Sequence, residues 1–191
     1  MTLLWFNIAL FLELLATGGF IIYIIKQEKW IFRCSYWTLA AGLVFHTIFL
    51  VYRYSILGVF PVLDLKSAFS FFAWAVIVVY LLLNVKFQLM VLGSFVAPFA
   101  AFLMLISSTI PGMEGPVKPI FKSLWLTIHV STIFIGNAFL AIAFLAAIMY
   151  LIQERHIKRK HFGSFYGRLP SLATLDRINH YAILYGFPFL T

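Results

Sequence analysis

Three side chains that can gain or lose a proton interrupt long apolar stretches of the sequence. They are Glu13, His46 and His129. An ionisable group at the centre of a membrane-spanning helix costs about 2.5–3.5 kcal/mol or more, so such residues mark functional sites or specific polar contacts. The chemistry open to them is metal coordination by imidazole, proton transfer, or hydrogen bonding to a neighbouring helix.

His46 has a cation on its own side of the expected helix. Arg53 follows at i+7, two turns nearer the end of the apolar stretch. Imidazole can bind heme iron, and an arginine can pair with a heme propionate. The spacing therefore allows His46 as an axial ligand and Arg53 as the propionate partner. The alternative is a neutral His46 hydrogen-bonded to another helix, and Glu13, at a similar depth, is a candidate partner.

His129 lies near the beginning of a later apolar stretch. Trp125 precedes it by four residues and so shares its helix face. Gly136 and two small hydroxyl residues follow, and small residues let a flat ligand or another helix come close. We interpret His129 as a candidate iron ligand with Trp125 beside it. The alternative is an interfacial tryptophan and a histidine used in ordinary packing.

The elements that must position these residues are membrane-spanning helices. Hydrophobic residues make up 63% of the 191 and charged residues 10%, whereas soluble domains have about 45–50% and about 25%. This excludes a disordered chain, a disulfide scaffold and an ordinary cytosolic enzyme. We predict an all-α polytopic membrane helix bundle in a single transmembrane domain, residues 1–191. Five full spans are expected at about 3–25, 36–52, 68–83, 87–106 and 121–152, and the start of a sixth, continuing beyond Thr191, from about 178.

Basic residues divide unequally between alternate loops. Ten follow the first, third and fifth spans: Lys26, Lys29, Arg33, Lys86, Arg155, Lys158, Arg159, Lys160, Arg168 and Arg177. The other loops hold four: Arg53, Lys66, Lys118 and Lys122. Since basic loops stay cytoplasmic, the N-terminus is expected outside. The net charge of +8 is then explained by orientation and by contact with anionic membrane lipids, without a nucleic-acid partner.

Motifs for self-contained catalysis are absent from the sequence. There is no GxSxG, no HExxH, no phosphate-binding glycine-rich loop and no set of paired carboxylates. The single cysteine, Cys34, excludes an internal disulfide and a CxxC pair. His156 and His161 fall in a basic run and are expected at headgroup level, and His180 is expected to be structural. We therefore assign no catalytic residue.

Five segments, taken in order, resemble a known family. They are His46–Arg53; Gly58–Val62 with Phe71–Trp74; Leu92–Pro98; Leu124–Val130; and Leu175–Asn179 with Gly186–Pro188. Together they resemble the heme-handling membrane subunit of the system II (Ccs) cytochrome c maturation machinery, within the cytochrome c assembly superfamily. The resemblance runs from about His46 to the end of the chain.

The resemblance implies a subunit that binds heme b and presents it on the outer face of the membrane. There a partner membrane subunit helps to attach it to the CxxCH cysteines of apocytochrome c. His129 matches the first of two outward-facing histidines of the family. The Trp-rich segment, the second outer histidine and a later membrane histidine would follow Thr191.

The family also implies a multi-pass protein of the cell inner (plasma) membrane and part of a cytochrome c heme lyase. The chain by itself is not expected to be active. Two other functions stay open: a non-catalytic regulator or scaffold, like members linked to heme biosynthesis, and a small-solute transporter. A Trp-rich segment after Thr191 would favour heme delivery over the regulator, and a heme-free purified protein would favour the transporter.

Overall fold

The computed structural model describes residues 2–58, 62, 64–112, 123–158 and 166–191, and these residues form helices and no strand. In chain order the α-helices are α1 (Thr2–Lys26), α2 (Lys29–Leu57), α3 (Leu65–Phe87), α4 (Gly93–Thr109), α5 (Leu124–Lys158) and α6 (Leu172–Gly186). Short 3₁₀ turns lie at Tyr166–Arg168 and Phe187–Phe189. The predicted all-α fold is confirmed.

Four of these helices are long and apolar enough to cross a membrane: α1, α2, α3 and α5. The helix α4 is also apolar but has 17 residues, about 26 Å of helix against a hydrocarbon core of about 30 Å. The protein is therefore a multi-pass membrane helix bundle. The fourth span is shorter than the sequence predicted.

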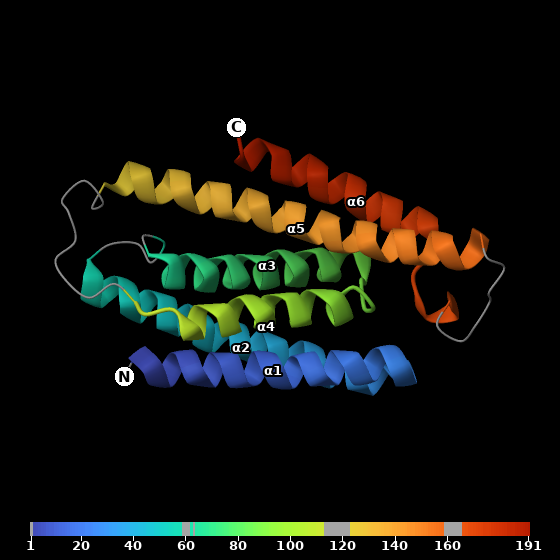
Figure 1. The fold of residues 1–191 in the computed structure, drawn as a ribbon, viewed down its shortest axis with the longest axis horizontal. Coiled ribbons are helices and arrows are strands. Elements are labelled where there is room, and N and C mark those ends of the chain that lie inside the picture. Colours follow the sequence, from blue (N-terminus) through green and yellow to red (C-terminus); the bar gives the residue numbers. More distant parts are fainter. Residues whose placement is uncertain (1, 59–61, 63, 113–122, 159–165) are drawn as a thin grey trace.

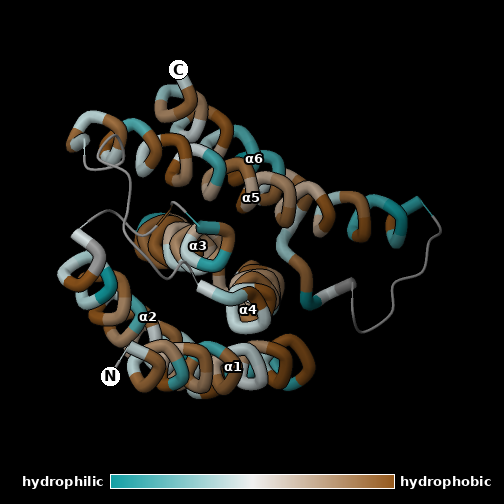
Figure 2. The backbone as a smooth tube through the Cα atoms, turned by 60° about the vertical axis from the view of Figure 1, so that its left-hand side comes forward, coloured by the Kyte–Doolittle hydropathy of each residue, from teal (hydrophilic) through white to brown (hydrophobic). Residues whose placement is uncertain are grey.

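Successive helices run in opposite directions and pair as three hairpins, α1–α2, α3–α4 and α5–α6 (Figure 1). The α3–α4 hairpin lies between the other two, with α1 packed on α4 and α5 packed on α3 (Figure 2). Burial follows from this order. In the most apolar stretch of α3, 56% of residues are buried, against 28% in α1. The middle hairpin is the core of the bundle.

Helix boundaries differ from the expected ones where polar residues were taken as loops. The helix α2 begins at Lys29 rather than near Tyr36, because lysine and arginine are good helix formers that reach the headgroup region with their long side chains. The helix α3 continues through Asn84 and ends at Phe87, and Gln88, whose φ is 52°, caps it. The break before the fourth span thus lies at residues 88–92.

The sixth helix also begins earlier than predicted. Ser171 caps α6, accepting a hydrogen bond from the Thr174 backbone N–H. Residues 172–177, which precede the predicted start of the sixth span at about 178, are therefore part of α6.

Two places of close approach fix how the helices pack. At the start of α4, a Cβ on Gly93 would lie 2.3 Å from Tyr80 Oη and 2.5 Å from Phe20 Cε1, so only glycine fits there. Between α5 and α6, a Cβ on Gly186 would lie 2.7 Å from Phe139 Cβ and 3.2 Å from the Gly136 carbonyl oxygen. Gly136 was expected to let a flat ligand or another helix come close, and in the structure it lets α6 come close.

Basic residues of the described chain gather at one end of the bundle. That end joins α1 to α2, α3 to α4 and α5 to α6 (Figure 1). It carries Lys26, Lys29, Arg33, Lys86, Arg155, Lys158, Arg168 and Arg177, and the opposite end carries Arg53 and Lys66. Arg159, Lys160, Lys118 and Lys122 lie outside the described residues. We call these the basic end and the opposite end.

Candidate functional site

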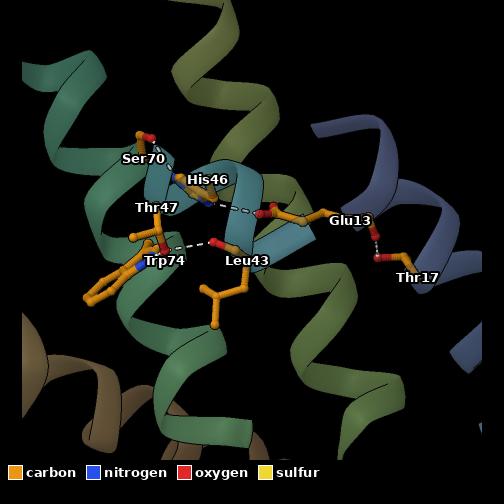
Figure 3. A network of polar contacts seen from close by, with 7 residues as sticks. All are labelled: Glu13, Thr17, Leu43, His46, Thr47, Ser70 and Trp74. Carbon is orange, nitrogen blue, oxygen red and sulfur yellow. Dashed lines mark hydrogen bonds and ion pairs between the residues drawn. The ribbon is translucent and has the colours of Figure 1, made fainter. Parts of the chain in front are cut away.

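His46 is at the centre of a polar cluster that joins three helices inside the bundle. Its Nδ1 lies 2.8 Å from Glu13 Oε1 on α1, and its Nε2 lies 2.9 Å from Ser70 Oγ on α3 (Figure 3). All three residues have an exposed fraction of 0%. The expected pairing of Glu13 with His46 is therefore found. We call these three residues the buried cluster.

The local sequence explains why Glu13 points inward. The buried residues of α1 are Phe6, Ala9, Glu13, Ala16, Phe20 and Tyr23, a spacing of three and four that defines one helix face. Glu13 lies within this stripe. Opposite it, a Cβ on Gly42 would lie 3.3 Å from Glu13 Cγ, so the glycine lets α2 come close enough for His46 to reach the carboxyl group.

Both ring nitrogens of His46 have protein partners in this cluster. Nδ1 faces the Glu13 carboxyl group and Nε2 faces the Ser70 hydroxyl, and which atom donates depends on the imidazole tautomer. Heme iron needs a ring nitrogen with a free lone pair. An axial role of His46 would therefore require one of these two contacts to break.

A second polar chain runs beside the first. Trp74 Nε1 donates to Thr47 Oγ1 at 2.9 Å, and Thr47 donates to the Leu43 carbonyl oxygen at 2.8 Å (Figure 3). It ties α3 to α2 one position along from His46. The first chain is buried, whereas the second passes through Thr47, which is exposed.

Arg53 lies nearer the opposite end than His46 and has a protein partner. Its Nη2 is 2.7 Å from Asp64 Oδ2, and the other Asp64 oxygen caps α3 through the Ser67 backbone N–H. Arg53 and Lys66 line a small cavity of about 170 Å³. Arg53 Nε is buried, with no partner among the described residues. One hydrogen-bond donor of Arg53 is therefore unused by the described residues.

His129 has surroundings opposite to those of His46. It lies in the second turn of α5 with its side chain exposed, and no hydrogen bond to its ring occurs among the described residues. Trp125, one turn earlier, is 79% exposed. Both ring nitrogens of His129 are thus open to a ligand beside an uncovered indole surface.

The structure therefore separates the four predicted ligand residues. Within the described part, no hydrogen bond or ion pair joins His46 or Arg53 to His129 or Trp125. Sequence reasoning missed Ser70 and Asp64. A serine in an apolar helix gives no signal of its partner, but Asp64, placed just before an apolar stretch, carries the usual signature of a helix N-cap.

Comparison with known proteins points to one family. A family model described as Cytochrome C assembly protein matches residues 62–191. A cytochrome c biogenesis protein CcsA from Guillardia theta is 29% identical over 187 residues, covering 88% of this chain and 62% of that protein. A CcsA from Chlamydomonas reinhardtii is 32% identical over 153 residues, covering 75% of this chain and 42% of that protein.

A relative with a different name is also similar. Protein HemX of Bacillus subtilis is 23% identical over 160 residues, covering 83% of this chain and 58% of that protein. The chain thus spans between 42% and 62% of the length of these three relatives. No solved structure matches it.

Proposed function

Because the chain belongs to the cytochrome c assembly protein family, we propose that it handles heme during cytochrome c biogenesis, with His129 as its iron ligand. The exposed imidazole of His129, unpaired among the described residues, carries the proposal. It lies at the opposite end of the bundle, away from the basic end. By the positive-inside rule this end faces the outer side, where heme would be passed on.

The residues around His129 fit a heme contact. An axial imidazole needs a free ring nitrogen and room for a flat macrocycle, and both are available on this face of α5. Trp125, exposed on the same face, offers an indole for stacking. When bound, heme b supplies the iron for this ligand and the vinyl groups that become thioethers.

A one-histidine site also suits delivery. A single axial bond holds heme less tightly than a closed site with two protein ligands, so heme can leave for its acceptor. The acceptor on this proposal is apocytochrome c with its CxxCH cysteines, and a partner membrane subunit completes the synthase. The location proposed is the cell inner (plasma) membrane or, since CcsA relatives occur in algae, a corresponding organellar membrane.

A second candidate function is a regulator or scaffold without synthase activity. The similarity to Protein HemX over 83% of the chain favours including it. The two candidates differ in what His129 does: heme delivery requires its ring nitrogen, whereas a scaffold does not.

The test is His129→Ala in the protein as it is made in the cell, with His156→Ala at the other end of α5 as the matched control. Covalent heme on a reporter cytochrome c should fall to background in His129→Ala and stay unchanged in the control. Protein level in the membrane should not change, because the His129 side chain is exposed. Added imidazole should partly restore heme attachment by replacing the lost axial ligand.

Normal heme attachment to cytochrome c in His129→Ala would exclude heme delivery through this residue. The scaffold function would then be the remaining candidate. Loss of the protein itself would show that His129 is structural.

A further inference from the structure

A groove on the outside of the α1–α2 hairpin has the form of a binding site for a lipid. It has a volume of about 540 Å³ and lies between the basic-end half of α1 and the first turns of α2. Leu14, Leu15 and Ile22 line its α1 side and are 40–55% exposed. Cys34 and Thr38 line its α2 side.

The groove exists because one glycine points into it. Around a Cβ placed on Gly18 there is no atom within 4 Å, whereas a Cβ on the adjacent Gly19 would lie 2.2 Å from Ser35 Oγ. Gly19 therefore serves the packing of α1 on α2. Gly18 serves no contact in the described structure, and its missing side chain leaves the floor of the groove open.

The mouth of the groove carries groups that suit a phospholipid headgroup. Lys26, in the last turn of α1, lines it and is exposed. Trp30 lines it as well, with its indole N–H donating to the Glu28 carboxylate. Tryptophan and lysine at the end of a membrane helix are the usual residues of the headgroup level, and the ammonium group favours an anionic headgroup.

The length of the groove indicates which molecule occupies it. From Lys26 to Leu14 is twelve residues, about 18 Å of helix, slightly more than half the hydrocarbon thickness of about 30 Å. An acyl chain reaches from the headgroup to the middle of the bilayer and would fill it. A helix from another protein would need a contact surface along the full span, and the groove ends halfway.

We propose that this groove, defined by Gly18 at its floor and Lys26 at its mouth, binds one anionic phospholipid from the leaflet at the basic end. This inference is independent of heme handling, since the groove contains none of the heme-site residues. The bound lipid would anchor the α1–α2 hairpin at the edge of the bundle. Of the four long apolar helices, α1 has the smallest buried share.

Cys34 gives a direct readout, because it is the only cysteine of the chain and it is exposed in the groove. The purified protein in detergent is reacted with N-ethylmaleimide, with phosphatidylglycerol or phosphatidylcholine added. At a phosphatidylglycerol concentration ten times its dissociation constant, the labelling rate should fall by about tenfold. Phosphatidylcholine at the same concentration should leave the rate nearly unchanged.

Two matched pairs of variants separate a built site from general lipid contact. Lys26→Gln should weaken protection by about fivefold, while Lys29→Gln, which removes the same charge beside the groove, should not. Gly18→Leu should abolish retention of phosphatidylglycerol measured by mass spectrometry of the intact protein. Ala41→Leu, which places the same leucine side chain at an exposed site of α2 outside the groove, should keep it.

Equal protection by both lipids would overturn the proposal, as would equal effects of Lys26→Gln and Lys29→Gln. Rapid disulfide formation between two copies through Cys34 in the membrane would also overturn it, because a second protein would then occupy the groove.

Discussion

His46 and His129 are both histidines within apolar helices, yet the structure gives them opposite surroundings. His46 is fully buried with Glu13 and Ser70 on its two ring nitrogens. His129 is exposed on α5 beside an uncovered Trp125. A membrane histidine is thus free for a ligand only where its neighbours leave a nitrogen unused, and depth in the bilayer does not decide this by itself.

The two histidines also belong to regions with different tasks. The buried cluster connects α1, α2 and α3 and so keeps the first hairpin on the middle one. The His129 face belongs to α5, which packs mainly on α6 and α3. Changes in the buried cluster should therefore reduce stability, whereas changes at His129 should reduce function.

The largest effect concerns which side of the membrane the His129 end of the bundle faces. With Cys34 replaced by serine, single cysteines are placed at Gly115 and Arg159, in connections outside the described residues. We expect a membrane-impermeant maleimide added from outside to label Gly115→Cys and leave Arg159→Cys unlabelled, because the basic end stays cytoplasmic. The reverse pattern would put His129 on the cytoplasmic side and contradict delivery to the outer face.

The next effect tests the buried cluster as a stabilising contact. His46→Leu leaves the Glu13 carboxyl group buried without its partner, which should lower the free energy of unfolding by about 3–5 kcal/mol. The double variant Glu13→Leu, His46→Leu removes both polar groups and should recover most of this loss. Unfolding in detergent by titration with dodecyl sulfate measures both.

If the double variant were as unstable as His46→Leu alone, the pair would not act as a unit, and another property of His46 would have to explain its burial.

A smaller effect is expected at the edge of the same cluster. Ser70→Ala removes the hydrogen-bond partner of His46 Nε2 but no charge. Hydrogen bonds between membrane helices contribute about 0.6 kcal/mol on average and up to about 1.7 kcal/mol. We expect a loss of unfolding free energy in this range by the same titration, with Ser108→Ala, an exposed serine of α4, as the control. A loss as large as that of His46→Leu would contradict the view that the Glu13–His46 pair contributes most of the stability of the cluster.

Much of the fold could be predicted from the sequence because the apolar stretches are long and the basic residues alternate. The residues at which helices end are harder to predict from the sequence. By polarity alone Asn84 and Lys86 would end a span, but the backbone continues through them, since ends depend on capping and on packing as well. The pairing of Glu13 with His46 could be anticipated from their similar depths.

The exposure of His129 and the role of Ser70 could not be predicted. Near His129, apolar residues and small hydroxyl residues are interspersed along α5, so the sequence does not indicate which face turns inward. The position of α3 beside the first hairpin depends on packing such as the contact of Gly93 with Tyr80 of α3 and Phe20 of α1. Only the assembled bundle brings Ser70 to His46.

The most direct test of the central claim, that His129 and not His46 is the iron ligand of this chain, is heme titration of purified residues 1–191. One free imidazole gives a single axial bond, so we expect heme to bind weakly and without a sharp low-spin spectrum. This binding should be lost in His129→Ala and kept in His46→Gln, whose amide retains polar contact with both neighbours. A stoichiometric low-spin spectrum that disappears in His46→Gln would contradict the account.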